Sequence, residues 1–489
     1  MWSLNNGFLF FYNGFCEMKQ TRLLLAFFIC LFVNVSCAKN IYISSSSGDD
    51  SNPGTIEKPL KSISAVKEKE NVNIWLLRGD VFYEKITGFH MCSFNAYGDG
   101  PKPVLCGFRI LKNPYAWVKC EQNGLWKLDL YNTSDFDGFK YKNATSMKSL
   151  CNVGVIYSCA DDKIYGEMAA SLEKLSDVGS FYVSSAYIKE GKNHEDFRWL
   201  YFKSPLSPDK LGKLCFSVGE TCISNVDSCT FENLSIVGFG KHGISPKSNT
   251  IISNCDIDII GGSLHLKNYF CRLGNGVEVW VPVESLVENI KVENCQITRT
   301  YDTATTIQGA KTNNSKVRNI HFVNNRIAFC RQAFERYLKP KESNAYYEQC
   351  SFENNLVYMC GSNLFGTRVQ DNNVNLLSYE EKGRPIKISN NTFWGGSLQY
   401  SQEFATGIEN NTFYIYRGDV LLNKNKTRKA IVAENDKSID LYKRVSLDES
   451  NIIIVDKKSS QDDSLKEMYR KQALKNFPII KDLDCLNNH

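Results

Sequence analysis

Two glutamates stand at matching places in short segments whose alternating apolar residues predict β-strands: Glu278 in GNGVEVW and Glu335 in QAFERY. With TATTIQG laid between them in register, one outward-facing column reads Glu278, Thr306, Glu335. The glutamates would then lie two strands apart, ~9.6 Å between backbones, so their carboxyl groups can reach the ~6.5–9.5 Å separation that inverting hydrolysis of a glycosidic bond requires. One carboxyl would donate a proton and the other would activate water. Asp302, in the turn before TATTIQG, is a third candidate catalytic carboxylate.

The next outward-facing column is suited to bind a sugar ring. The same register places Trp280, Gln308 and Tyr337 side by side, and the two aromatic rings could form a stacking platform. Arg331 and Arg336 could pair with the carboxylate of an acidic sugar. The alternative for each of these residues is an ordinary solvated surface, with Arg336 paired to its neighbouring glutamate.

Histidines and metal-binding patterns give weaker signals. His265 lies in the insertion GGSLHLKNYFCRL, from which a loop could deliver a base, and His242 is a second candidate. No acidic triad with a nearby arginine is visible on one face, so calcium has no support. No CxxC pair has a matching His or Cys partner, and no Gly-rich phosphate loop links a strand to a helix, so we expect no metal and no cofactor.

These residues lie within a repeated segment of the form [apolar]-x-Asn-x-x-[apolar]. The repeated asparagines are Asn233, Asn254, Asn294, Asn324, Asn354, Asn390 and Asn410. Each copy carries short alternating runs of Ile, Val and Phe between Gly, Asn and Asp, which predicts strands stacked into a solenoid. Asn tolerates the left-handed backbone that a sharp bend needs, and its amide can bond to the same amide one coil away, at ~4.8 Å.

The repeats resemble those of right-handed parallel β-helix proteins of the pectate-lyase-like superfamily. The segment IYISSSSGDDSNPGTIEKPLKSI (41–63) is similar to the capped first turn of many secreted polysaccharide-acting members, and the resemblance covers roughly 41–110 and 220–425. It implies an all-β, right-handed parallel β-helix with an N-terminal cap. It implies a reaction much less specifically, because this fold also serves binding and structural roles.

The sequence divides into five parts by composition and period. They are a leader (1–38), a cap with the first coils (39–110), an inserted mainly β subdomain (111–205), the repeats (206–425) and a C-terminal cap or tail (426–489). Within the insertion, MAASLEKLSD (168–177) predicts a helix. Within the tail, SSQDDSLKEMYRKQALKNF (459–477) predicts a helix that would cover the far end of the solenoid.

The leader is typical of an export signal. From Met18, which we interpret as the natural start, a basic region is followed by the apolar run 23–33, too short to span a bilayer, and by small residues at 36–38. Cleavage after Ala38 and lipidation of Cys37 are alternative outcomes. We therefore expect the protein in the periplasm, outside the cell, or anchored at the cell surface through Cys37.

The net charge limits the classes of partner, and the positions of the cysteines bear on whether they form disulfides. The formal net charge of +5, with Lys and Arg scattered along the chain, argues against nucleic acid. No segment after the leader is apolar enough to cross a membrane. Many of the 18 cysteines lie inside the repeats, which favours free buried thiols over disulfides. We expect a monomer acting on a polysaccharide or oligosaccharide.

Three functions remain open from the sequence. The first is a secreted glycoside hydrolase that uses paired carboxylates. The second is a polysaccharide lyase, in which a base removes a proton next to a uronic carboxylate. The third is a glycan-binding solenoid without catalysis.

Overall fold

The computed structural model covers the whole chain and describes most of it. The described residues are 38–184, 197–265, 268–309, 314–338, 346–361, 364–366, 376–378, 386–395, 398–400, 408–416, 420–423, 431–432, 451–455 and 460–476. The leader up to Cys37, and most of 426–459, lie outside them. Residues from Asn40 onward form one compact unit, which contains every candidate site residue.

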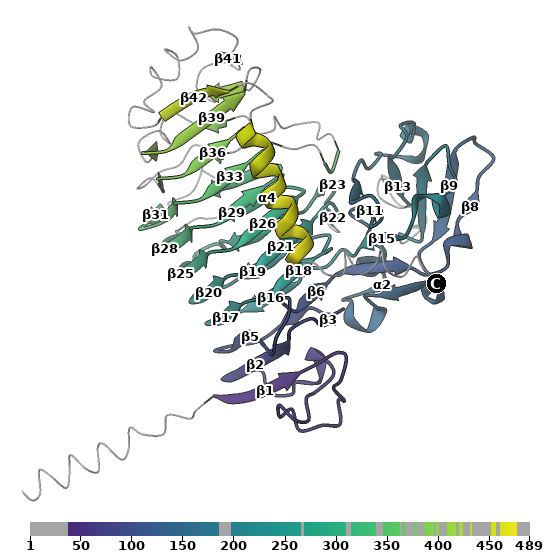
Figure 1. Cartoon of the computed structure of the whole chain (residues 1–489), viewed down its shortest axis with the longest axis horizontal. Coiled ribbons are helices and arrows are strands. Elements are labelled where there is room, and N and C mark those ends of the chain that lie inside the picture. Colours follow the sequence, from purple (N-terminus) through teal and green to yellow (C-terminus); the bar gives the residue numbers. More distant parts are fainter. Residues whose placement is uncertain are drawn as a thin grey trace, which may run out of the picture. The chain divides into compact units, whose positions relative to one another are not determined.

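Three long sheets, in which every pairing is parallel, build the coils (Figure 1). The β24 sheet runs β34-β30-β27-β24-β19-β16-β4. Its strands, in that order, are Leu376–Ser378, Gln332–Leu338, Thr303–Gly309, Val277–Trp280, Ile244–Pro246, Ile223–Val226 and Ile86–Thr87. This sheet carries six of the candidate residues, which are Glu278, Trp280, Gln308, Glu335, Arg336 and Tyr337.

The β25 sheet follows in each coil and runs β1-β2-β5-β17-β20-β25-β28-β32-β35-β38, with β31 beside β28. Its strands are Lys39–Ile43, Val72–Leu77, Ser93–Tyr97, Thr230–Glu232, Thr250–Ser253, Leu286–Glu293, Lys316–Val323, Ser351–Glu353, Lys387–Ser389 and Ile408–Glu409, and β31 is Tyr346–Glu348.

The β26 sheet completes each coil and runs β3-β6-β18-β21-β26-β29-β33-β36-β39-β42. Its strands are Val81–Phe82, Val104–Cys106, Ser235–Val237, Asp256–Ile260, Gln296–Thr300, Arg326–Ala328, Leu356–Tyr358, Thr392–Trp394, Thr412–Tyr416 and Asn451–Val455. Repetition of one strand from each sheet, in the same chain order, makes a right-handed parallel β-helix. The predicted fold is confirmed, and it is the architecture of the proteins that the repeats resemble.

The repeated asparagines bend the chain as predicted. All seven have positive φ, from 49° at Asn254 to 60° at Asn233. Six of the seven side chains are exposed, because a left-handed residue at this corner points outward. Only the first two continue the predicted amide ladder, in which Asn254 donates to Asn233 and Asn233 donates to Asn95.

In the later coils the ladder runs one residue further along the chain, which corrects the prediction. Asn325, Asn355, Asn391 and Asn411 are buried, and the side-chain amide of each of the first three donates to the side-chain oxygen of the next at 2.9 to 3.1 Å. The same amides also donate to backbone carbonyls, such as that of Phe322 from Asn355 at 3.0 Å. The inward-pointing residue takes this role because the buried backbone at the corner needs partners.

The named strands of the insertion all pair antiparallel, with one isolated parallel bridge between Met168 and Phe181, and the insertion is larger than predicted. It begins with β7 (Phe108–Leu111) and returns with β15 (Leu214–Ser217), because these two strands pair with each other. The first sheet is β10-β7-β15-β11-β12, and the second is β13-β14-β9-β8. The remaining strands, β8 to β14, are Val118–Lys119, Leu125–Asp129, Phe136–Gly138, Ile156–Ser158, Lys163–Tyr165, Phe181–Val183 and Trp199–Lys203.

The helix predicted at 168–177 is wrong. Only the 3-10 turn η5 (Leu172–Lys174) forms there. Met168 pairs with Phe181, and the Ala169 N–H donates to the Phe181 carbonyl, so extended pairing overrides local helix propensity. The α-helix of the insertion is instead α2 (Met147–Cys151). Other short 3-10 turns are η1 (Ile63–Ala65), η2 (Pro114–Ala116), η3 (Thr133–Asp135), η4 (Tyr141–Asn143) and η6 (Pro208–Leu211).

The predicted C-terminal helix forms as α4 (Ser460–Asn476) but lies elsewhere than expected. It runs across the outer face of the β26 sheet rather than over the end of the solenoid (Figure 1). Tyr469 stacks on Tyr358 at 5.5 Å, and the Tyr358 hydroxyl donates to Asp462 at 2.6 Å. The helix goes there because a stacked column of Ala328, Tyr358 and Trp394 leaves an apolar stripe on that face.

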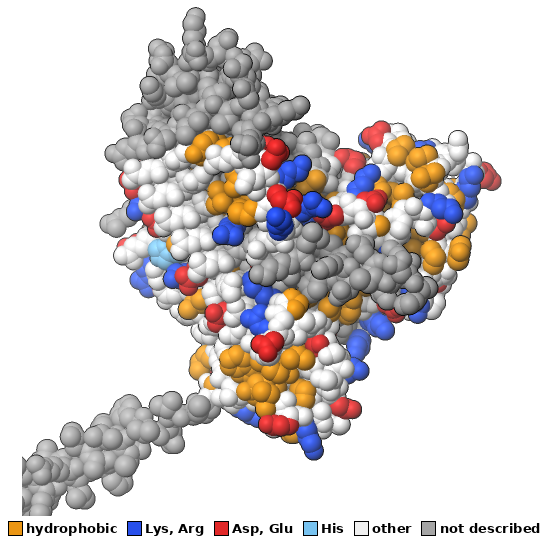
Figure 2. Space-filling view, in the orientation of Figure 1, with side chains coloured by type: hydrophobic (Ala, Val, Ile, Leu, Met, Phe, Trp, Pro, Cys, Tyr) orange, Lys and Arg blue, Asp and Glu red, His pale blue; other side chains and the backbone are white. Residues whose placement is uncertain are grey.

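Two further observations concern the surface and the thiols. Acidic and basic side chains are interspersed on the face shown in Figure 2, as a weak net charge predicts. No helix among the described residues is long and apolar enough to cross a membrane. Twelve of the fourteen cysteines of the described residues are buried, which agrees with the predicted burial of these side chains within that part.

The remaining strands belong to two small sheets. A hairpin pairs β22 (Leu264–His265) with β23 (Asn268–Arg272). The other sheet is β37-β40-β41, formed by Leu398–Tyr400, Val420–Asn423 and Ile431–Val432.

Candidate active site

The predicted register of the candidate strands is confirmed. Glu278 pairs with Thr306 and Thr306 with Glu335, so the three residues form one column across β24, β27 and β30. We call this the glutamate column. Two residues further along, Trp280, Gln308 and Tyr337 form a second column, here the aromatic column.

The glutamate column is nearly buried although it lies on the outer face of the sheet. Glu278 is 7% exposed and Glu335 is 8% exposed, and Thr306 between them is fully buried. An ordinary solvated surface, the alternative considered from the sequence, does not fit such glutamates. A carboxylate is costly to bury unless it is hydrogen-bonded, so its partners decide what the site can do.

A third column of polar residues, which the sequence reasoning missed, supplies those partners. Its members stand two residues before the first inward-facing residue of their strands, at the corner where the coil turns. They are His242, Asn275, Thr303 and Gln332. We call this the corner column. Its members bond from coil to coil: the Asn275 N–H to His242 Nδ1 at 3.2 Å, the Thr303 N–H to Asn275 Oδ1 at 3.1 Å, and Thr303 Oγ1 to Gln332 Oε1 at 3.0 Å.

The signal for the corner column is present in the sequence. The alignment that predicts the glutamate column already contains NGV, TAT and QAF, and one further coil adds HGI. The polar first residue of each triplet is the corner residue. His242 on its own gives only the weak signal of a lone histidine, and its alignment with Asn275 and Thr303 reveals its place.

The corner column holds both glutamates in place. Asn275 Nδ2 donates to Glu278 Oε1 at 3.2 Å, and Thr303 Oγ1 lies 3.5 Å from Glu335 Oε2. From the aromatic column, Gln308 Nε2 donates to Glu278 Oε1 at 2.7 Å. Side chains from several coils therefore converge on Glu278.

His242 completes the surroundings of Glu278. Its Nδ1 accepts the Asn275 N–H, so the neutral ring carries its proton on Nε2, which lies 3.4 Å from Glu278 Oε2. Ser245 Oγ lies 3.5 Å from the same carboxylate oxygen. Every described contact of Glu278 thus comes from a hydrogen-bond donor, which is the environment of an ionised, acceptor-only carboxylate.

Asp302 and Arg331 lie at the corner itself. The backbone N–H of Asp302 donates to the Gly274 carbonyl at 2.9 Å. The backbone carbonyl of Asp302 accepts the Gln332 N–H at 3.0 Å. Asp302 is half-buried and directly precedes Thr303 of the corner column, while Arg331 is buried one coil further on. Asp302 and Arg331 therefore lie near the glutamates in the sequence and on neighbouring coils. Their roles in catalysis and in substrate binding stay predictions.

Arg336 and His265 are not part of the two outward columns. Arg336 pairs with Ile307 in an inward column, is buried, and lies over the Tyr347 ring at 5.6 Å. This placement gives no support to its predicted contact with an acidic sugar. His265 ends β22, and Asn152 of the insertion holds that hairpin through bonds of 2.7 and 3.0 Å to the Leu264 backbone.

Arg272 ties the insertion to the coils beside the site. It donates to four backbone carbonyls, those of Gly154, Gly166, Gly262 and Phe365, at 2.6 to 3.1 Å. Its guanidinium also lies 4.4 Å over the ring of Tyr301, the residue before Asp302. The insertion and the coils approach each other closely here, which explains why residue 154 is a glycine. A Cβ at Gly154 would lie 2.4 Å from the Gly261 carbonyl oxygen.

The described residues contain no group of three or more His, Cys, Asp or Glu side chains that could hold a metal ion.

Comparison with known proteins gives a fold likeness at low similarity. No protein-family model matches the chain, and no curated protein matches it. The complex of XylC with xylose is 11% identical with a TM-score of 0.38, over 85% of this chain and 82% of that chain. The GH136 lacto-N-biosidase from Eubacterium ramulus is 14% identical with a TM-score of 0.36, over 90% of this chain and 70% of that chain.

A third solved structure is endopolygalacturonase I from Stereum purpureum complexed with two galacturonates. It is 10% identical with a TM-score of 0.26, over 81% of this chain and 98% of that chain. At these identities and TM-scores, the likeness assigns this chain neither a family nor an activity.

Proposed function

We propose that this protein is a carbohydrate-active enzyme that hydrolyses a glycosidic bond in a polysaccharide. The observation that supports this most is the glutamate column, in which two nearly buried carboxylates flank the short Thr306 on the outer face of the sheet. Two coils separate the backbones by ~9.6 Å, which fits the spacing of an acid and a base with a water molecule between them.

Glu278 is the residue suited to act as general base. His242, Asn275, Gln308 and Ser245 all present donors to its two oxygens, and this set favours an ionised carboxylate that can accept a proton from water. Glu335 is then the proton donor to the leaving oxygen, since inversion needs one carboxyl group in each form.

The aromatic column extends along the same face and would bind the sugar rings. Trp280 is 44% exposed, and Gln308 and Tyr337 are half-buried. The two rings, two coils apart, could each stack on a sugar unit while Gln308 holds Glu278. Substrate would therefore lie across the coils with its scissile bond over Thr306.

Product analysis by mass spectrometry would test the reaction. The purified protein would be incubated with a panel of neutral, uronic and sulfated polysaccharides. Fragments that have gained water would support hydrolysis. Fragments with an unsaturated end would overturn it in favour of β-elimination, the alternative considered from the sequence.

The affinity of the Glu335→Gln variant for the cleaved polysaccharide would test the site separately. A catalytic glutamate predicts lost turnover with retained binding, because the variant keeps the size and most contacts of the side chain. Retained turnover would show that the glutamate column is not the active site. Lost binding together with lost turnover would give Glu335 a binding role instead.

A further inference from the structure

The insertion contains a basic cavity made by residues other than those of the glutamate column. The cavity measures about 500 Å³ and lies between β7, β10, η4 and α2. Four cationic side chains line it, those of Arg109, Lys112, Lys140 and Lys142, against the single carboxylate of Asp137. An excess of cations around one cavity favours an anionic occupant.

Arg109, at the base of this cavity, is a buried cation without an acidic partner among the described residues. It is 1% exposed. Its hydrogen bonds go to neutral groups, the Leu130 carbonyl at 2.9 Å and Cys151 Sγ at 3.6 Å, and its guanidinium stacks 3.8 Å over the Phe136 ring. Burial lowers the pKa of Arg109 from its ordinary value, as expected for a charge that no carboxylate compensates.

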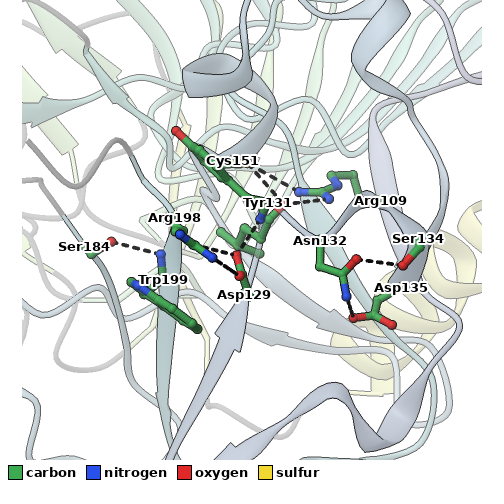
Figure 3. A network of polar contacts seen from close by, with 11 residues as sticks. Arg109, Asp129, Tyr131, Asn132, Ser134, Asp135, Cys151, Ser184, Arg198 and Trp199 are labelled. Carbon is green, nitrogen blue, oxygen red and sulfur yellow. Dashed lines mark hydrogen bonds and ion pairs between the residues drawn. The ribbon is translucent and has the colours of Figure 1, made fainter.

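The carboxylates around Arg109 are already engaged: Asp137 of the cavity lies 3.8 Å from Lys112 Nζ, and Asp129 and Asp135 have partners in the network of Figure 3. Asp129 pairs with Arg198, whose Nη2 lies 2.8 Å from Asp129 Oδ2. Asp135 accepts from the Asn132 amide at 2.7 Å and from the Asn113 amide at 2.8 Å. Buried charges in proteins are ordinarily paired, so the missing partner of Arg109 points to a ligand.

We infer that this cavity is a second glycan-binding site that takes the carboxylate or sulfate group of an acidic sugar. The anionic group would reach Arg109, whose planar guanidinium suits bidentate recognition of such groups, and Lys140 and Lys142 would hold it from the rim. Tyr141, on the rim and 55% exposed, offers a ring on which the sugar can stack. The sugar part of this inference rests on the proposed function, and the anion part rests on Arg109 and its surroundings.

Isothermal titration calorimetry on the whole protein would test the inference. The probes would be a uronic-acid trisaccharide, a sulfated disaccharide, a neutral trisaccharide and inorganic sulfate. We expect at least one acidic saccharide to bind and the neutral one not to bind. We expect the double variant Lys140→Ala/Lys142→Ala to bind the acidic saccharide about 10-fold more weakly, since it loses two exposed charge contacts.

The matched control is Lys119→Ala/Lys174→Ala, which removes two exposed lysines of the same insertion that do not line the cavity. This control should bind like the wild type. Adding the acidic saccharide should raise the melting temperature of the wild type and leave that of Arg109→Gln unchanged. This difference would place the anion at the buried guanidinium.

Three results would overturn the inference. The first is that neither acidic saccharide binds. The second is that the Lys140/Lys142 variant binds as tightly as the wild type. The third is that inorganic sulfate binds as tightly as the saccharides, which would leave no role for the sugar. None of these measurements depends on turnover. Their results therefore stay the same whether or not the protein hydrolyses a glycosidic bond.

Discussion

The coils and the insertion position their polar side chains in different ways. In the coils, the register of one strand fixes the neighbours of every residue on it, so Glu278, Thr306 and Glu335 align because their strands do. In the insertion, each contact joins residues at unrelated separations, as Arg109 joins Leu130 and Cys151. A site built on a periodic scaffold can therefore be recognised from sequence, whereas a site built on an aperiodic one depends on contacts that no period reveals.

The largest expected effect concerns catalysis on the coils. Glu278→Gln and Glu335→Gln should each lower kcat about 100- to 10,000-fold, the range for loss of a general acid or base. Glu353→Gln, a control on the same coil as Glu335 but in the β25 sheet, should leave kcat unchanged. Steady-state kinetics on the polysaccharide that the wild type cleaves would measure this. Equal losses in all three variants would indicate general instability rather than catalysis.

The next effect concerns the junction between the two regions. Arg299 pairs with the fully buried Asp258 on the coils and with Asp162 of the insertion. Arg299→Met should cost about 3–5 kcal/mol of unfolding free energy, because it leaves Asp258 buried without its cation. Chemical denaturation would measure it.

Asp162→Asn is the matched variant on the insertion side of that junction. Its carboxylate is half-exposed, so the substitution should cost less than about 1 kcal/mol. If the two variants were equally destabilised, the insertion would depend on this junction as much as the coils do, and the contrast between the regions would weaken.

A smaller effect separates two adjacent asparagines within one coil. Asn355→Ala removes a buried ladder member and should cost about 1–3 kcal/mol, because it leaves donors and acceptors of the neighbouring coils unpaired. Asn354→Gly should change stability by less than about 0.5 kcal/mol, since glycine accepts its φ of 55° without strain. Melting temperatures of the two variants would show the order, and a reversed order would contradict the roles given to the two positions.

The smallest effect concerns an exposed ion pair on the coils. Burial alone would raise the pKa of Glu353, but hydrogen bonds from Lys387, Ser351 and Ser389 outweigh it and lower that pKa below its ordinary value. The stabilisation is therefore present above the ordinary carboxyl range and is lost as pH falls through the lowered pKa. Lys387 is half-exposed, so the pair is worth at most about 1 kcal/mol.

Lys387→Met would test this pair. The difference in melting temperature between the variant and the wild type should be measurable at pH 7 and should shrink toward pH 3. A difference that stays constant over that range would show that the pair contributes nothing that depends on the charge of Glu353.

The sequence was informative where local pattern and structure share one cause. Alternating apolar residues and left-handed asparagines determine the coils directly, so the strands, the corners and the glutamate column could all be predicted. The ladder was predicted one residue too early, because the sequence does not show which of two adjacent asparagines points inward.

The rest depended on contacts between distant segments. The segment 168–177 has helix-forming residues, yet the pairing of Met168 with Phe181 decides its conformation. The position of α4 follows from an apolar stripe that exists only after the coils stack. The burial of Arg109 in the insertion likewise has no counterpart in its local sequence.

The stacking of identical coils also sets how this protein can change in length. The corner asparagines are spaced by 20 to 40 residues, yet their strands stay in register because the loops absorb the difference. One residue added inside a strand would turn every following side chain of that strand to the opposite face. A whole added coil would instead lengthen the stack by ~4.8 Å and leave each column aligned. The outer face can therefore be lengthened or shortened in whole steps, without altering the chemistry of the coils already present.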